Sequence, residues 1–231
     1  MFDRYSITVS ASVLADRFQM EVPKRYKPRY NAGPSQLLPV ITIGSAGLSY
    51  FYWGMMPEWA KNKTISEKII NVRAEQVNEK PMFRKKLDKF RCIVPCDGFY
   101  LWKKVGKKSN IPYRLFEKQK TCFSLAGFWE EFEDAEGENH HTFSIITKPS
   151  SPPILPIHER MPVILDKVNE KKWLAKDANE SELLPIFVAD QKIELDLYSV
   201  SPRIASLEND QPSLILPSAP ADQHGNLTLF D

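Results

Sequence analysis

The segment IHERMPVIL brings together three side chains that can transfer protons or bind anions. His158, Glu159 and Arg160 supply an imidazole, a carboxylate and a guanidinium, directly before Met161-Pro162 and the apolar run 163–165. If that run is a buried strand, His158 is held by a rigid element, as proton transfer requires. A turn with polar residues ahead of a core strand explains the same letters. From this segment alone, both interpretations stay open.

Three upstream segments accompany it: YFYWGMMPEW, INVRAEQ and RCIVPCDGFYLW. Taken together and in this order, they resemble the SOS response-associated peptidase (SRAP) family, which senses abasic sites in single-stranded DNA. The resemblance extends from RYS near the N-terminus, through YNAGPSQ, to VSPRIASLEND near the C-terminus. Several motifs in the right order are far more specific than any one of them.

The resemblance implies a role for each matched residue. Asn71 would orient the N-terminal amine, Arg73 would contact phosphate, and His158 would transfer protons at the sugar. Further DNA contacts are expected from residues spread along the chain: Arg4, Trp53, Met55, Pro57, Glu75, Arg84 and Arg160. Simpler interpretations stay open. Trp53 could be a core residue, Asn71 a helix N-cap, and the Arg73 and Glu75 side chains an ordinary solvated pair.

Two positions depart from the family pattern. The family begins Met-Cys-Gly-Arg, and its cysteine, once exposed by removal of Met, forms a thiazolidine with the abasic aldehyde. This chain begins Met-Phe-Asp-Arg, so Phe2 replaces the cysteine and Asp3 replaces the glycine. The family's acid–base glutamate falls on Leu101, which has no proton to give. Because Phe2 is bulky, Met1 is expected to stay. A smaller departure is Ala205, where the family often has Asn.

We therefore expect a catalytically degenerate member that binds single-stranded or junction DNA, including abasic DNA, without a covalent bond. Two alternatives stay open. One is an abasic-site lyase that acts through the Met1 amine or a lysine, since Schiff-base chemistry needs no thiol. The other is a pseudoenzyme that binds a protein or peptide in the former active cleft. No cofactor or metal is expected, because CIVPC has neither the spacing nor the histidines of a zinc site.

Bulk properties limit these options. The 231 residues carry a net charge of only +2, so DNA binding must depend on a local basic patch. The resemblance places that patch along one groove lined by Arg4, Arg73, Arg84, Lys85, Lys86, Lys89 and Arg91. Three cysteines, Cys92, Cys96 and Cys122, are expected to be buried thiols. With no signal-peptide pattern and no membrane span, a cytoplasmic location is expected.

The elements that must position these residues alternate between short strands and helices. A helix capped by Ser10 is expected over 10–20, a hairpin around the glycines at 44 and 47, and mainly helix over 65–90. Strands follow from Cys92, broken by an acidic loop over 130–141. This pattern predicts an α+β class. The resemblance implies a single domain over 1–216 with a curved, barrel-like mixed β core flanked by helices. Residues 217–231 are expected to form a flexible tail.

Overall fold

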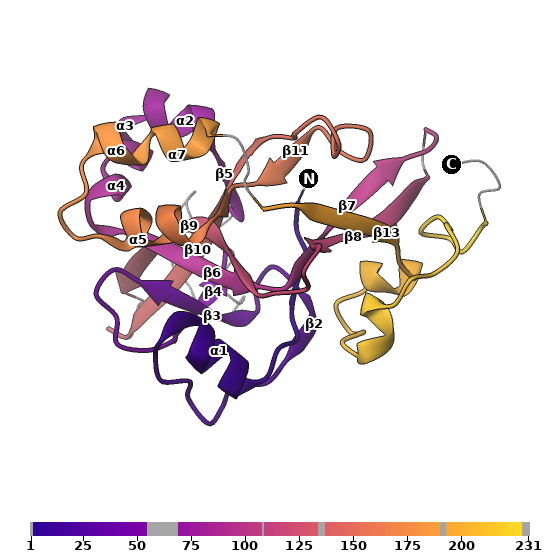
Figure 1. Ribbon diagram of the computed structural model, residues 1–231, viewed down its shortest axis with the longest axis horizontal. Coiled ribbons are helices and arrows are strands. Elements are labelled where there is room, and N and C mark those ends of the chain that lie inside the picture. The colour runs from indigo at the N-terminus through magenta and orange to yellow at the C-terminus, as the bar shows by residue number, and fades with distance from the viewer. Residues whose placement is uncertain (1, 55–68, 108, 134–136, 190–192, 228–231) are drawn as a thin grey trace.

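The computed structural model describes residues 2–54, 69–107, 109–133, 137–189 and 193–227 (Figure 1). The strands are β1 Tyr5–Ile7, β2 Arg29–Ala32, β3 Leu37–Thr42, β4 Ser49–Trp53, β5 Asn71–Arg73, β6 Arg91–Cys96, β7 Gly98–Lys104, β8 Asn110–Glu117, β9 Phe123–Glu133, β10 Asn139–Pro149, β11 Arg160–Pro162, β12 Ile164–Leu165 and β13 Leu195–Ser199. The helices are α1 Ala11–Phe18, α2 Ala74–Glu79, α3 Pro81–Arg84, α4 Lys86–Lys89, α5 Lys167–Leu174, α6 Glu180–Leu183 and α7 Pro185–Val188, followed by the 3-10 turns η2 Pro202–Ala205 and η3 Pro212–Ile215.

Five strands close into a barrel, which is the centre of the fold. Neighbours pair in the order β10, β4, β3, β6 and β9, and β9 pairs back with β10. The pairing of β10 with β4 is parallel and the others are antiparallel, so the barrel is mixed. Closure leaves these strands few open edges, and their inward side chains form a continuous apolar core. The α+β class with a barrel-like mixed core, expected from the sequence, is confirmed.

A second sheet, in the order β13-β8-β7-β1-β2, carries the start of the chain to the barrel (Figure 1). A buried ion pair holds β1 in this sheet. Arg114 Nη2 of β8 lies 3.1 Å from Asp97 Oδ1, which also accepts a 2.6 Å hydrogen bond from Ser6 Oγ of β1. Gly98 makes room for it, since a Cβ there would lie 2.8 Å from the Arg114 guanidinium. The first residues of the chain are thereby fixed relative to β7.

Helix boundaries follow local signals. Ser10 caps α1 by accepting a hydrogen bond from the Val13 amide, as predicted, and Leu14 is buried. Val13 is exposed, so the buried face of α1 is narrow. Asp166 caps α5, whose Trp173 is fully buried beneath the barrel. None of the helices in the described ranges is long and apolar enough to cross a membrane.

Several expected boundaries were wrong. Residues 71–73 are a strand, because β5 pairs with β10, and only then does helix α2 begin. The acidic segment is largely a hairpin, since β9 extends to Glu133 and β10 starts at Asn139. Hydrogen bonds are also present past residue 216: Ser218 exchanges hydrogen bonds with Ser199, and Asp222 is buried and accepts from Asn226. Pro217 pairs with Val200, directly after β13, and the domain end at residue 216 stays a prediction.

Candidate functional site

The start of the chain is anchored in the core. The Phe2 side chain is 1% exposed and packs against Trp53 and Phe99, with ring centroids 5.5 Å and 5.9 Å away. Asn71 Nδ2 donates a hydrogen bond to the Phe2 carbonyl oxygen. Since Arg73, not Asn71, occupies the N-cap position of α2, the helix-cap interpretation of Asn71 was wrong. Asn71 instead holds the backbone of the residue that replaces the family's cysteine.

Trp53 and Leu101 belong to the same apolar core as Phe2. Trp53 has no exposed surface, and its indole N–H donates a 2.8 Å hydrogen bond to the Ile70 carbonyl. A fully buried ring cannot stack on a base unless it moves, so its observed role is structural support. Leu101 is 1% exposed, so the position of the missing glutamate belongs to the same core. The predicted wall residues Met55 and Pro57 lie outside the described residues.

His158 lies just before β11 and is half-buried. Its Nδ1 is 2.9 Å from the Arg160 carbonyl oxygen and 3.1 Å from the Arg160 amide nitrogen, so the backbone fixes the ring plane. Burial is the largest influence on this imidazole and lowers its pKa. The ring is therefore neutral at pH 7, the form that can accept a proton.

Arg160, two residues after His158, forms a bidentate ion pair with Glu75, which we call the fork. Arg160 Nη1 and Nη2 lie 3.0 Å and 2.9 Å from the two carboxylate oxygens of Glu75, and Nη2 donates a 2.7 Å hydrogen bond to the Thr147 carbonyl. The hydrogen bonds from Arg160 lower the pKa of Glu75. Bidentate geometry of this kind joins α2, β10 and β11. Glu75 is therefore a partner of Arg160 as well as a predicted DNA contact.

The remaining predicted DNA contacts lie apart from one another. Arg4 Nη1 is 3.3 Å from Asp3 Oδ2, and Arg4 Nη2 donates to the Ala205 carbonyl, which ties the chain start to η2. Arg73 is exposed. Arg84 makes an exposed bidentate pair with Glu180 across α3 and α6, with Nη2 2.6 Å from Oε2. Arg4 is therefore held by Asp3 and η2, whereas Arg84 is held by α6.

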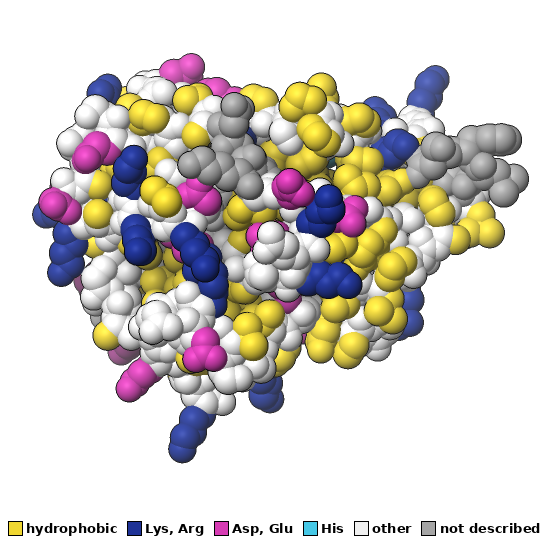
Figure 2. All heavy atoms as spheres, viewed as in Figure 1, with side chains coloured by type: hydrophobic (Ala, Val, Ile, Leu, Met, Phe, Trp, Pro, Cys, Tyr) yellow, Lys and Arg dark blue, Asp and Glu magenta, His cyan; other side chains and the backbone are white. Residues whose placement is uncertain are grey.

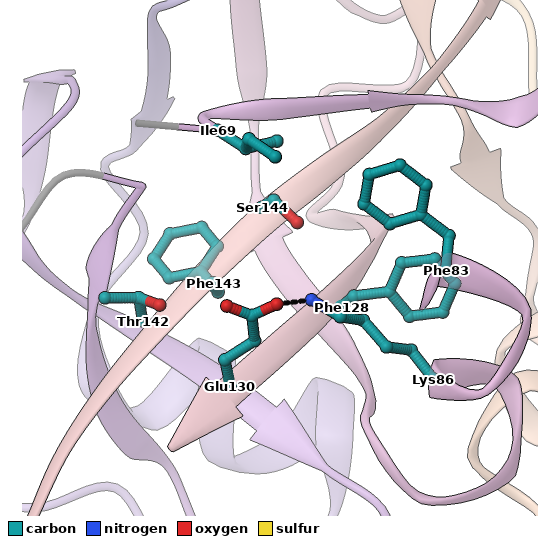
Figure 3. Close-up of a pocket in the computed structure, with 8 residues that line it drawn as sticks. All are labelled: Ile69, Phe83, Lys86, Phe128, Glu130, Thr142, Phe143 and Ser144. Carbon is teal, nitrogen blue, oxygen red and sulfur yellow. Dashed lines mark ion pairs between the residues drawn. The ribbon is translucent and has the colours of Figure 1, made fainter. Parts of the chain in front are cut away.

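For two other basic residues, Arg91 and Lys86, the predicted position in that groove was wrong. Arg91 is fully buried and donates to the Leu87, Trp173 and Ala175 carbonyls, so its charge serves helix ends rather than DNA. Lys86 is paired with Glu130 over a slot of about 10 Å³, enough for one water (Figure 3). On the face in Figure 2, Lys and Arg alternate with Asp and Glu and form no continuous band.

An open pocket of about 660 Å³ lies at Asp3 and His158. It is lined by Asp3, Trp102, Lys104, Asn110, Leu155, Pro156, Ile157, His158 and Glu159. Strand β7 contributes Trp102 and Lys104 to this lining, and β11 begins directly after Glu159 (Figure 1). Sequence reasoning missed Asp3 as a site residue because it was considered only as a departure from the family's glycine. Its position next to Phe2 was the available signal.

The cysteines offer no substitute thiol near the chain start. Cys92, Cys96 and Cys122 are all buried and free, as expected. Burial raises the pKa of each thiol, that of Cys122 to about 12. Because the thiolate is the nucleophile, these groups are unreactive in this state. In the described parts of the chain, His, Cys, Asp and Glu form no group that could hold a metal ion.

These features define a class of protein: a closed mixed barrel whose candidate site lies at its own first residues, beside Asn71 and the His158 segment. The model of the family "SOS response associated peptidase (SRAP)" matches residues 1–207. The chain therefore belongs to the SRAP family.

Individual relatives agree. The "Abasic site processing protein YoqW" of Bacillus subtilis is 38% identical over 221 residues, spanning 93% of this chain and 99% of the relative. The "Abasic site processing protein HMCES" of Rattus norvegicus is 28% identical, spanning 87% of this chain and 68% of the relative. A crystal structure of a Bacteroides thetaiotaomicron protein is similar with a TM-score of 0.80 and 29% identity, spanning 93% and 99% of the two chains.

Proposed function

We propose that this protein binds single-stranded or junction DNA at abasic sites without forming the thiazolidine crosslink. One observation carries the proposal: Phe2 stands where the family's cysteine would be, and its side chain is buried against Trp53 and Phe99. The names of its relatives supply the substrate class, since YoqW and HMCES are abasic site processing proteins. A cytoplasmic location is part of the same proposal.

The loss of chemistry has two physical causes. An apolar ring cannot close a thiazolidine, and the buried cysteines have raised pKa values and lie on β6 and before β9. Leu101 also has no proton to donate and no charge that could stabilise an iminium ion. Non-covalent binding to DNA needs neither a thiol nor a carboxyl group. It needs cations for phosphates, and we assign these contacts to Arg4, Arg73 and Arg160 together with Arg84.

Binding of this kind should depend strongly on salt, because phosphate contacts release condensed counterions. The test uses fluorescence anisotropy with a single-stranded oligonucleotide that carries one abasic site, beside an intact strand of the same sequence. The same samples are run on a denaturing gel. We expect salt-sensitive anisotropy and no shifted band. A heat-stable covalent band would show that another nucleophile acts and would overturn the non-covalent mode.

Matched variants sharpen this test. Arg73→Ala removes an exposed guanidinium beside Asn71, and Lys107→Ala removes an exposed charge from the β7–β8 turn. We expect Arg73→Ala to weaken binding and to reduce the salt slope by about one, while Lys107→Ala has a smaller effect. Salt-insensitive binding, or none, would instead favour the pseudoenzyme that binds a protein or peptide.

A second candidate function is an abasic-site lyase that uses the Met1 amine or a lysine. The polar pocket beside His158 favours it, because an imine needs a nearby base to promote elimination. Reduction with borohydride during incubation would trap such an imine as a stable adduct. If no adduct forms with abasic DNA, this candidate is excluded.

A further inference from the structure

The connection between α1 and β2 carries cations that the proposed site does not use. Its residues 23–28 read PKRYKP, and we call them the basic turn. The Tyr26 amide donates a 2.9 Å hydrogen bond to the carbonyl three residues earlier, so Lys24 and Arg25 occupy the central positions of a β-turn. Lys24, Arg25 and Lys27 are all exposed. The basic turn therefore presents three positive charges to solvent, close together in sequence.

Contacts with the rest of the fold hold the basic turn in place. Tyr26 is 9% exposed, and its hydroxyl donates a 2.7 Å hydrogen bond to the Val9 carbonyl. Directly after the turn, Arg29 Nε lies 2.8 Å from Asp210 Oδ2. Oδ1 of the same carboxylate accepts a 2.6 Å hydrogen bond from the Tyr30 amide. Because the backbone is already ordered on both sides, a ligand that binds these cations does not have to order it.

The charges of the basic turn are not neutralised within the described part of the chain. No ion pair between described residues includes Lys24 or Lys27. Arg25 lies over the ring of Tyr50, with its guanidinium carbon 4.0 Å from the ring centroid, and a stacked guanidinium keeps its full charge. Glu21 is the acidic residue nearest in sequence and is also exposed. Three cations against this one carboxylate leave a local positive excess.

Cations elsewhere on the molecule are less available. Arg84 and Arg160 are each paired with a carboxylate, so each must leave it before binding a phosphate, and Arg91 is buried. The basic turn is also remote from the pocket at His158. In Figure 1, α1 and β2, which the turn connects, lie in the lower part of the view, whereas β11 lies at the top. A strand held in the pocket can therefore reach the basic turn only if it is long enough to cross this face.

We infer that the basic turn is a second phosphate-binding surface, which holds the DNA backbone on a flank of the abasic site. This inference rests on the proposed function, because the abasic nucleotide must occupy the pocket. A polyanion suits the turn, since its phosphates can meet several cations at once and release their condensed counterions. Contacts of this kind position a strand without reading its sequence. DNA should therefore bind more tightly when its flank is long enough to reach the turn, whatever its bases.

The experiment measures fluorescence anisotropy with two abasic single strands, one of about eight and one of about 24 nucleotides, since single-strand sites span about 4–16 nucleotides. It compares the unmodified protein with a turn variant and a control variant that removes the same charge from exposed positions elsewhere. The turn variant combines Lys24→Gln, Arg25→Gln and Lys27→Gln, and the control combines Lys120→Gln, Lys171→Gln and Lys172→Gln.

We expect the turn variant to bind the long strand about tenfold more weakly at low salt, with the short strand unchanged and little effect in the control. The salt slope for the long strand should fall by about two, because each lost contact removes about 0.7. Lys24→Gln with Lys27→Gln keeps the contact between Arg25 and Tyr50 and should remove about 1.4 from the slope. Lys24→Arg with Lys27→Arg keeps the charge and should bind like the parent. Circular dichroism checks that each variant is folded.

The outcomes separate this inference from the proposed function. Equal affinity of the unmodified protein for the two strands, or an unchanged long-strand affinity in the turn variant, would overturn the inference alone. A loss of the same size on both strands would also overturn it, because the turn would then act on the pocket or the fold. If the unmodified protein binds neither strand, the proposed function is overturned as well.

Discussion

The two sides of strand β7 near the chain start differ sharply. On one side, Phe2 and Leu101 belong to the closed apolar core and have about 1% of their surface exposed. On the other, Asp3 and His158 line an open pocket. The positions to which we assign the lost covalent chemistry are apolar, while polar groups line the open side. The proposed loss of crosslinking therefore leaves the polar pocket in place.

The largest effect should come from placing a charge on the apolar side. Leu101→Glu buries a carboxylate without a partner, and we expect a loss of about 3–5 kcal/mol in the free energy of unfolding at pH 7. Burial would raise the pKa of this carboxyl above its unfolded value. The penalty should therefore grow as pH rises and shrink at low pH, where the group is neutral. Urea unfolding at pH 4 and pH 8 measures it, and a pH-independent loss would contradict this account.

Phe2→Ala tests the same side by removing volume instead of adding charge. Phe2 is buried between two aromatic rings, so the cavity should cost about 3 kcal/mol of unfolding free energy. Val188→Ala is the control, because Val188 is 84% exposed and should change stability by less than about 0.5 kcal/mol. Similar Tm values for the two variants would show that Phe2 is not part of the core.

The double variant Phe2→Cys with Leu101→Glu asks whether the lost chemistry can be restored. A cysteine side chain is smaller than the phenyl ring it replaces and leaves room for the carboxylate, so we expect part of the crosslinking to abasic DNA to return. Asp3, in place of the family's glycine, should limit the recovery. A denaturing gel detects the crosslink, with each single variant as a control. If crosslinking is absent in a double variant that remains folded, the barrier lies elsewhere in the site.

The smallest effect is expected on the polar side. Glu75→Gln breaks the exposed fork with Arg160 and should cost about 0.5–1 kcal/mol at pH 7, since solvent screens the pair. The pKa of Glu75 is lowered by folding, so its contribution is present above its ordinary value of 4.5. It should be lost as pH falls through the lowered pKa. Glu79→Gln on the same helix is the control, and an equal effect there would exclude a specific role for the fork.

Particular residues show how far sequence reasoning reached. The barrel class, the cap at Ser10 and the buried cysteines were predicted correctly, because each depends on local pattern or family order. Arg91 and Lys86 were misplaced because a cationic side chain has the same letter whether it faces solvent or a carbonyl. Asp3 was overlooked as a site residue, since no local pattern shows that a pocket opens beside it.

The sequence by itself determined that residue 2 is Phe and residue 101 is Leu, and our proposal of binding without a thiazolidine depends on these two residues. It also determined the family and the strand-rich core, because order of motifs and apolar periodicity are properties of the chain. Only the tertiary structure decided that Asn71 donates a hydrogen bond to the Phe2 carbonyl and that Arg160 pairs with Glu75. It also decided that Asp3 and His158 line the same pocket. Each of these joins residues far apart in sequence, and such contacts exist only once the barrel has closed.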